Sequence, residues 1–248
     1  MDFHVRKPGS WSSMPLFKKL EIYQSQLSKK YAPYVDKLRA KEIVKEMAKD
    51  DISVAKVVRI LEGPTDFKES DIHPDHIIKA THGCGWNISM TNTTSVSEVH
   101  TLLKKWNCPY RHTVEMQYNY IPPRFFIEEK INDICLGITD TAITFMFRCI
   151  HGEPVTIGIR CGKSQNNYDL NWNMIKKQEH TYILEKPSYL PRMIALAKKL
   201  SQPFEFVRID VYIDKDENIY FSEFTFSPSG GAMFFPLDIE KKLGKLWR

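Results

Sequence analysis

The sequence predicts an α+β fold made of two sheet-bearing lobes. Strand-like and helix-like segments are mixed along the 248 residues, and the later strands form hairpins instead of alternating singly with helices. No internal repeat or low-complexity linker interrupts this pattern. A chain of this length can build one or two domains with a substantial buried core.

Helical periodicity dominates the start of the chain. Apolar residues recur at helical spacing over residues 14–49. Tyr31-Ala32-Pro33 divides this region into two helices, and Asp36 is the expected N-cap of the second. The further helices expected from the same periodicity are 97–106, 191–200 and one that follows Leu237.

Alternating apolar residues and turn residues predict the strands. Gly63-Pro64 ends the first strand, Pro122-Pro123 precedes a later one, and His151-Gly152-Glu153 is the turn of a hairpin. The expected strands are 54–61, 76–79, a short one near Asn87, 124–129, 143–150, 155–159, 206–213 and 219–226.

Composition places the chain among ordinary globular proteins. Apolar residues make up 42% and charged residues 26%, which excludes global disorder. The net charge of +5 comes from lysines spread along the chain without a single basic stripe. The charge density is below that of a nucleic-acid binder, so no nucleic-acid partner is expected. The mild positive bias suits an anionic small ligand about as well as a weak membrane or RNA contact.

The cysteines and the chain start indicate the compartment. Five cysteines are an odd number without a CxxC pair, which argues against a disulfide framework or a zinc site and favours a reducing environment. The first residues have no apolar core of signal-peptide length, and no stretch approaches the roughly 20 apolar residues needed to span a bilayer. We expect a soluble cytoplasmic protein, whose oligomeric state the sequence leaves open.

The last strand pair carries the most informative polar residues. Asp210 interrupts an apolar strand, and the period of two places Glu223 and Thr225 on one face of the following strand. A hairpin would bring that face beside Asp210. Two neighbouring carboxylates and a hydroxyl are ligands that suit Mg²⁺, while a solvated sheet face is the alternative interpretation.

A lysine followed by a glycine loop is the second feature. Lys79 ends one strand, and Gly83-Cys84-Gly85 follows it. Glycines let the backbone approach a phosphate, and the lysine would add a point charge. The loop is neither a Walker loop nor GxGxxG, so a plain hairpin turn is the alternative.

The strand 124–129 ends in two acids, Glu128 and Glu129. In a nucleotide site such a segment can present backbone groups to adenine and a carboxylate to ribose, although an exposed strand end explains it equally well. The histidines show no metal-binding spacing, and neither Cys84 nor Cys108 lies in a nucleophile signature.

The order of these features resembles the nucleotide site of ATP-grasp enzymes, and more narrowly the TupA-like ATP-grasp proteins, named for teichuronopeptide synthesis. The resemblance covers roughly residues 30–240, and its last two stretches are the most specific. The matching stretches are 36–40, 77–85, 124–129, 168–172, 207–212 and 220–231.

The resemblance implies a role for each site residue and implies ATP and Mg²⁺ as cofactors. Lys37 and Lys79 would contact the ATP phosphates, and a loop that includes Thr81, Gly83 and Gly85 would close over them. Glu128 and Glu129 would frame adenine and ribose, and Asp210, Glu223 and Thr225 would bind Mg²⁺. Arg160 would contact the γ-phosphate or an acyl phosphate, with Arg208 as second candidate.

The chain departs from the family pattern in three places. Relatives often carry a phosphate-facing lysine where this chain has Met146, so either Arg148 or Arg160 supplies that charge or phosphate handling is impaired. The glycine loop carries the large Trp86, which bears on lid closure. Little length is left for the separate N-terminal domain of many ATP-grasp enzymes.

The resemblance implies an ATP-dependent carboxylate–amine ligase that acts through an acyl phosphate, on a uronic acid or glycan-linked carboxylate in polysaccharide biosynthesis. A small-molecule kinase and a non-catalytic nucleotide-binding module are the alternatives. The expected organisation is an N-terminal helical segment (1–35), a small lobe with the glycine loop (36–123) and a large lobe with the metal site (124–248), the two lobes holding ATP between them.

Overall fold

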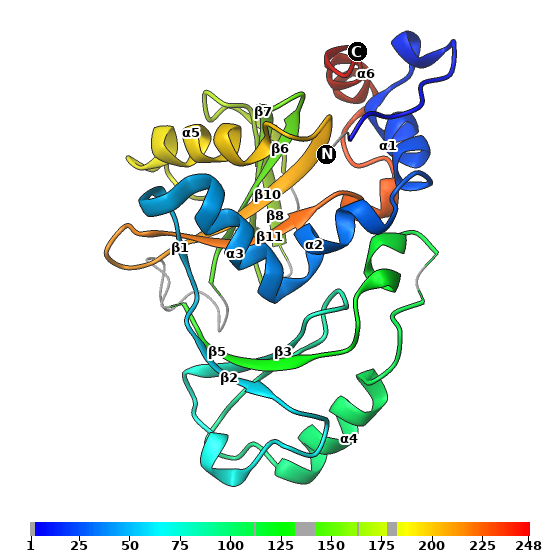
Figure 1. The fold of residues 1–248 in the computed structure, drawn as a ribbon. Helices are drawn as coiled ribbons and strands as arrows, with labels where there is room; N and C mark the ends of the chain where they lie inside the picture. The colour runs from blue at the N-terminus through cyan, green and yellow to red at the C-terminus, as the bar shows by residue number, and fades with distance from the viewer. Residues whose placement is uncertain (1–2, 112, 132–141, 163, 178–182) are drawn as a thin grey trace.

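Two β-sheets form the framework of the computed structural model, which describes residues 3–111, 113–131, 142–162, 164–177 and 183–248 (Figure 1). A seven-stranded sheet has the order β1-β11-β10-β6-β7-β8-β9, and a four-stranded sheet has the order β2-β5-β3-β4. The strands are β1 Ser53–Val54, β2 Val57–Leu61, β3 His76–Ala80, β4 Asn87–Ser89, β5 Phe125–Glu129, β6 Thr144–Ile150, β7 Glu153–Cys161, β8 Ser164–Tyr168, β9 Met174–Lys176, β10 Phe206–Ile213 and β11 Ile219–Thr225. The α-helices are α1 Leu16–Gln24, α2 Ala32–Val35, α3 Lys37–Ala48, α4 Val96–Trp106, α5 Leu190–Ser201 and α6 Leu237–Leu246.

The fold is α+β, as the sequence predicts. The described neighbours in both sheets pair antiparallel except β1, which runs parallel to β11 and makes the larger sheet mixed. Each sheet has its own apolar core, so the molecule has two lobes, which Figure 1 shows one above the other.

The large sheet has one apolar face and one polar face because its central strands alternate. Ile209 and Val211 of β10, and Phe145 and Phe147 of β6, are fully or almost fully buried on one face. Helices α3 and α5 pack against this side of the sheet (Figure 1). The other face carries polar side chains, and these include Arg208, Asp210, Arg148, Thr156, Arg160, Gln165 and Asn167.

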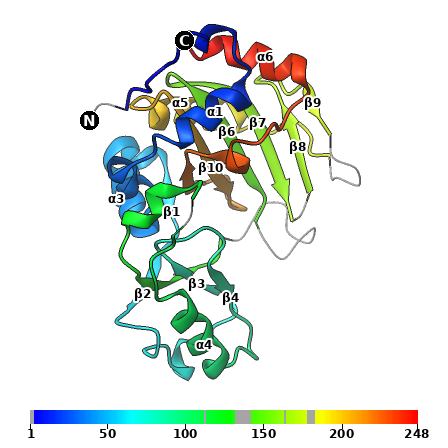
Figure 2. The ribbon, with the colours of Figure 1, turned by 90° about the vertical axis from the view of Figure 1, so that its right-hand side faces the viewer.

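The small sheet repeats this division on a smaller scale. Phe125 and Ile127 of β5 are buried in a core that includes Val99 and Leu103 of α4. Figure 2 shows α4 on the side of this sheet that lies away from the large sheet. The alternate residues of β5, Phe126 and Glu128, face the other way, toward the large lobe.

Helix α3 begins where the sequence predicts, at an aspartate N-cap. The Asp36 carboxylate accepts hydrogen bonds from the N–H groups of Leu38 (3.0 Å) and Arg39 (3.2 Å). Its other oxygen lies 2.6 Å from Arg124 Nη2, just before β5. The cap therefore ties the first turn of α3, which carries Lys37, to the small lobe.

Two boundaries differ from the sequence prediction. Residues 54–61 are not one strand: β1 pairs with β11 in the large sheet, and β2 pairs with β5 in the small sheet. The boundary at residue 124 would assign β5 to the second lobe, yet β5 pairs with both β2 and β3. Local alternation and the Pro122-Pro123 break reveal a strand but not its hydrogen-bond partners, which explains both differences.

The two ends of the chain meet at Glu205, just before β10. Its buried carboxylate accepts hydrogen bonds from Val5 N–H (3.1 Å) and Trp247 Nε1 (2.9 Å), and it pairs with Lys7 (2.8 Å) and His4 (3.0 Å). Burial opposes the charge, but these partners outweigh it and lower the pKa of Glu205 from 4.5 to about 2.

Glu205 should therefore make folding stability depend on pH in the acidic range. Because its pKa is lower in the folded state, its contribution is present above pH 4.5 and is lost as the pH falls toward 2. Urea unfolding measures the free energy of unfolding at each pH. Between pH 4.5 and 2, wild type should lose about 1–2 kcal/mol more of this free energy than Glu205→Gln does, after allowance for solvent screening. The exposed Glu46→Gln should follow wild type; equal losses in all three would contradict the role of Glu205.

Candidate functional site

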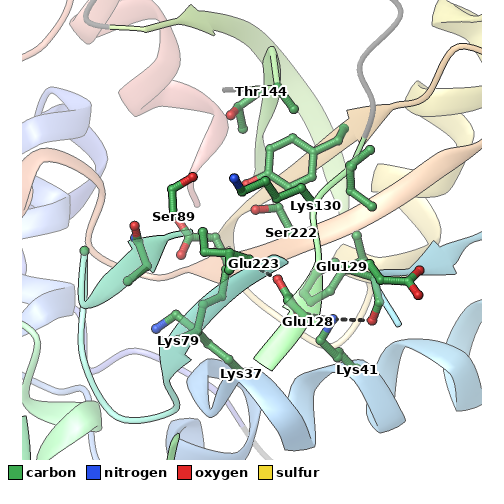
Figure 3. A pocket seen from close by; sticks show the side chains of 18 of the residues that line it. Lys37, Lys41, Lys79, Ser89, Glu128, Glu129, Lys130, Thr144, Ser222 and Glu223 are labelled. Atoms are coloured by element: carbon green, nitrogen blue, oxygen red, sulfur yellow. Dashed lines mark hydrogen bonds and ion pairs between the residues drawn. The ribbon is translucent and has the colours of Figure 1, made fainter. Parts of the chain in front are cut away.

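A cavity of about 480 Å³ lies between the two sheets and helix α3. Figure 3 shows its lining from both lobes: Lys79 and Glu128 from the small sheet, Thr144 and Glu223 from the large sheet, and Lys37 with Lys41 from α3. Its floor and roof therefore come from strands far apart in the sequence.

Three lysines give one side of the cavity a positive charge. Lys37 and Lys41 lie four residues apart on α3, so they share one helix face, and Lys79 faces the cavity from β3. Lys37 Nζ donates to the backbone carbonyl of Gly83, and Lys41 Nζ donates to the carbonyl of Ala55 (2.8 Å). Burial lowers the pKa of Lys37 and of Lys41.

Glu128 holds two of these lysines. It is only 3% exposed; its Oε2 lies 2.8 Å from Lys41 Nζ, and its Oε1 pairs with Lys79. Burial opposes the charge of Lys79, but Glu128 outweighs it and raises the pKa of Lys79. The two lysines likewise overcome burial and lower the pKa of Glu128. One carboxylate shared by two ammonium groups leaves a net positive charge in the cavity.

The glycine loop after β3 brings backbone close to this charge. Gly85 has a positive φ of 70° and lines the cavity. A Cβ at Gly83 would lie 2.6 Å from the ring of Trp86, so this position requires glycine. Trp86 stacks on Trp106 of α4, with ring centroids 5.8 Å apart and an interplanar angle of 3°. The large side chain thus fastens the loop to α4.

The acidic pair of the last two strands lies on the opposite wall. Asp210 pairs with Glu223 across the β10–β11 ladder, and a β-bulge follows at once, because Val211 is opposite Phe221. The extra residue on β11 is Ser222, and both Ser222 and Glu223 line the cavity (Figure 3). Simple alternation would have turned one of them away.

One guanidinium contacts all three predicted metal ligands. Arg208 Nε and Nη2 donate to the two oxygens of Asp210 (2.7 and 2.6 Å), a bidentate pair. Arg208 Nη2 also lies 3.4 Å from Glu223 Oε1 and 3.1 Å from Thr225 Oγ1. Complete burial raises the pKa of Asp210 and Glu223 adds to this, while Arg208 opposes it.

The donor chemistry of this cluster fits Mg²⁺. Two carboxylates and a hydroxyl are hard oxygen ligands, and Mg²⁺ is commonly bound by one or two carboxylates plus phosphate oxygens. Among the described residues, no group of three or more His, Cys, Asp or Glu side chains is placed to hold a metal. A cation bound by Asp210 and Glu223 would thus take its remaining ligands from elsewhere. Arg208 would first have to release the two carboxylates.

The structure distinguishes the two arginines that the sequence offered in place of the lysine expected at position 146. Arg160 pairs with Thr144 across β6 and β7, and both line the cavity. Arg148 is 3% exposed and lies outside the cavity lining. Met146 is fully buried between Asp210 and Gly158 in the ladder. Arg160 is therefore the arginine placed to face a ligand.

The predicted site residues separate into two groups. Most line the cavity or contact a residue that does; Thr81 is fully buried, and Gly83 is outside the lining but accepts from Lys37. Those in the lining are Lys37, Lys79, Gly85, Glu128, Glu129, Arg160 and Glu223, while Arg208, Asp210 and Thr225 adjoin Glu223. Sequence reasoning missed Lys41, whose spacing from Lys37 was a usable signal, and Ser222, which only the bulge brings in.

The chain is similar to several solved structures. The ADP complex of N5-carboxyaminoimidazole ribonucleotide synthetase is similar with a TM-score of 0.52 at 13% identity, covering 86% of this chain and 50% of that one. D-alanine–D-alanine ligase from Bacillus anthracis with ATP gives 0.49 at 13%, covering 86% and 62%. The ATP-grasp ligase PsnB with a precursor variant, Mg and ADP gives 0.47 at 11%, covering 89% and 60%. The chain thus spans half to somewhat under two thirds of these proteins.

These similarities concern the fold, which is that of the ATP-grasp enzymes. The model of the TupA-like ATP-grasp family matches residues 17–248, so the chain belongs to that family. No curated protein matches the chain. In the described part of the chain, no helix has both the length and the apolar character to cross a bilayer.

Removal of the charge on Glu128 should destabilise the cavity wall. Glu128→Gln leaves Lys41 and Lys79 without a counterion, which should cost about 2–4 kcal/mol of unfolding free energy at pH 7. The loss should shrink only above about pH 10, because Glu128 raises the pKa of Lys79 in the folded state above its ordinary value. Neighbouring Glu129, which pairs with Lys56 at the surface, is the matched control: Glu129→Gln should cost less than about 0.5 kcal/mol. Similar costs in both variants would show that Glu128 does not neutralise the lysines.

Proposed function

We propose that this chain is an ATP- and Mg²⁺-dependent carboxylate–amine ligase. One observation carries the proposal: the cavity has lysines on the wall formed by α3 and the small sheet, and Glu223 next to Asp210 on the wall formed by the large sheet. A magnesium–triphosphate needs both charges, because its phosphates favour the lysines and its metal favours the acids. Membership of the TupA-like ATP-grasp family supports the same conclusion.

Each group of residues in and beside the cavity has its own role in the proposed site. Lys37 and Lys79 bind phosphates, the loop at Gly85 offers backbone N–H groups, and the segment at Glu128 and Glu129 contacts adenine and ribose. Asp210, Glu223 and Thr225 would hold Mg²⁺, which would supply neutralisation of the phosphate charge. Arg160 faces the transferred phosphoryl group, and Arg208 joins it after release from Asp210.

The proposed reaction has two steps. A carboxylate oxygen of the acceptor takes the γ-phosphoryl group of ATP, and ADP leaves. An amine nitrogen then attacks the acyl carbon, phosphate departs with the electrons of its C–O bond, and the amine loses a proton. Positioning and charge stabilisation suffice, so no protein nucleophile is needed. By family analogy the acceptor is a uronic acid or a glycan-linked carboxylate in polysaccharide biosynthesis.

One observation favours a second candidate, a non-catalytic nucleotide-binding module. Met146 is buried beside Asp210 where relatives often place a phosphate-facing lysine. Against this, the acidic pair would be costly to keep for binding alone. A small-molecule kinase would use the same site, with a hydroxyl in place of the carboxylate.

Calorimetric titration with Mg-ATP tests the site. Wild type should bind, and Asp210→Asn or Glu223→Gln should weaken binding about tenfold or more and lower turnover about 10²-fold, because a metal ligand is lost. Asp238→Asn, a surface change on α6, should match wild type. Absence of Mg-ATP binding by wild type would contradict the ligase hypothesis and both alternatives.

Product analysis separates the three activities. With candidate carboxylates, a ligase releases ADP and free phosphate and forms an amide only when an amine is present. Phosphate that stays on the product without an amine identifies a kinase. If Mg-ATP binds but no acceptor causes ADP release, the result supports a non-catalytic nucleotide-binding module.

Metal binding without nucleotide tests the position of Arg208. Because its guanidinium holds Asp210 on both oxygens, Mn²⁺ alone should bind weakly to wild type. Arg208→Met should strengthen Mn²⁺ binding at pH 8 by about tenfold, since a competing charge is removed. Electron paramagnetic resonance of free Mn²⁺ measures this directly, with the surface variant Arg192→Met as control. Unchanged Mn²⁺ affinity in Arg208→Met would show that Asp210 and Glu223 are not the metal ligands.

A further inference from the structure

A second polar cluster lies on the same face of the large sheet, farther from the small lobe than Asp210. Arg148 pairs with Arg208 across β6 and β10 and with Thr156 across β6 and β7. Asn167 of β8 is next to it: Arg148 Nη1 donates to Asn167 Oδ1 at 3.2 Å. In Figure 2, β7 runs from the side of α6 toward the small lobe and β8 runs back, so the end of the sheet near α6 is remote from the small sheet.

The cluster has more hydrogen-bond donors than acceptors. The guanidinium of Arg148 has five N–H groups, and Asn167 Oδ1 also receives Gln165 Nε2 (3.2 Å). The amide nitrogen of Asn167 and the hydroxyl of Thr156 are buried and have no hydrogen-bond partner among the described residues. Buried polar groups are rarely left unpaired, so a group that only accepts hydrogen bonds would complete this cluster.

The cluster also has an excess of positive charge. Among the described residues, no carboxylate pairs directly with Arg148: Asp210 is held by Arg208, and Glu240 accepts the N–H groups of Phe17, Phe234 and Phe235. Burial, with the nearby charge of Arg208, lowers the pKa of Arg148 to about 9. An unpaired buried charge is costly, so an anion would be favourable here.

Two adjacent aromatic residues cover the buried Arg148 guanidinium. Its guanidinium carbon lies 4.8 and 5.0 Å from the ring centroids of Phe234 and Phe235, which contribute aromatic faces but no oxygen acceptor. Lys176 Nζ donates to the carbonyl of Phe234. The preceding residue, Met233, is 57% exposed, Phe234 is partly buried and Phe235 is buried.

We propose that Arg148, Asn167 and Thr156 form an anion subsite that binds a second carboxylate or phosphate group of the acceptor substrate. The inference rests on the proposed function, because it places the reacting carboxylate at Arg160 and the Asp210–Glu223 pair. Arg148 lies two residues along β6 from Met146, the partner of Asp210, which is a distance of about 7 Å. Thr144, the partner of Arg160, is about 13 Å from Arg148 along the same strand. The acceptor therefore carries its second anionic group about 7–13 Å from the reacting carboxylate.

The subsite makes Arg148 a specificity-determining residue. Its planar fork matches a carboxylate or phosphate, and the free N–H of Asn167 and O–H of Thr156 are further donors. A monoanionic acceptor would leave these donors unpaired and bind more weakly, as sites built around polar recognition do.

Calorimetric titration of the protein saturated with Mg-ADP tests the subsite, because the nucleotide then fills the phosphate-binding lysines. The probes have equal chain length: adipate with two carboxylates, 5-phosphonopentanoate with a carboxylate and a phosphonate, and hexanoate with one carboxylate. Wild type should bind at least one dianion about tenfold more tightly than hexanoate. The better dianion identifies the chemistry of the second group.

Two variants decide whether Arg148 is responsible. Arg148→Met should abolish the preference for the dianion and leave hexanoate binding unchanged. Asn167→Asp is nearly isosteric and supplies the missing carboxylate from within, so it should raise the Tm and also abolish the preference. Arg192→Met on the surface should behave as wild type.

Each outcome is decisive. No dianion preference in wild type, or a preference that survives Asn167→Asp, would mean that Arg148 only supports the fold, even if Arg148→Met proves unstable. The proposed function is judged separately by Mg-ATP binding. If that binding is absent, the same probes titrated into nucleotide-free protein still report on the subsite, and loss of the preference in Asn167→Asp would uphold it alone.

Discussion

A buried guanidinium–carboxylate pair, Arg208 with Asp210, makes the polar face of the large sheet possible. Asp210 is fully buried next to Glu223, and two carboxylates this close would repel each other without a cation. Arg208 bonds to both oxygens of Asp210 and reaches Glu223 and Thr225 from the same strand. β10 and β11 can therefore pair through their polar residues and hold them in the middle of a sheet whose opposite face is apolar core.

Both lobes contribute charged side chains to one cavity, and α3, which packs on the large sheet, contributes two of the lysines. The small sheet and α3 bring lysines, of which two share Glu128, and the large sheet brings Glu223 and Arg160. The separation of the apolar cores follows from this arrangement, because each sheet buries one face and leaves the other for the cavity.

The sequence predicts local structure well and partners poorly. The N-cap at Asp36 and the β10–β11 hairpin follow from residue types and spacing, and Lys37 and Glu223, which these elements carry, line the cavity. The single strand predicted for 54–61 is two, because alternation does not reveal which sheet a residue pairs with. The bulge that admits Ser222, and the bond of Arg208 to Asp210, depend on cross-strand register and rotamer, which no single segment encodes.

The crossover between β1 and β2 has a mechanical consequence. Residues 55–56 leave the large sheet, where Val54 lies beside Phe221 of the strand that carries Glu223, and enter the small sheet. Ala55 lines the cavity, and its carbonyl accepts from Lys41. Any rotation of the small lobe relative to the large lobe must be accommodated at these two residues and at the segments on either side of β5, so the cavity wall would change shape with it.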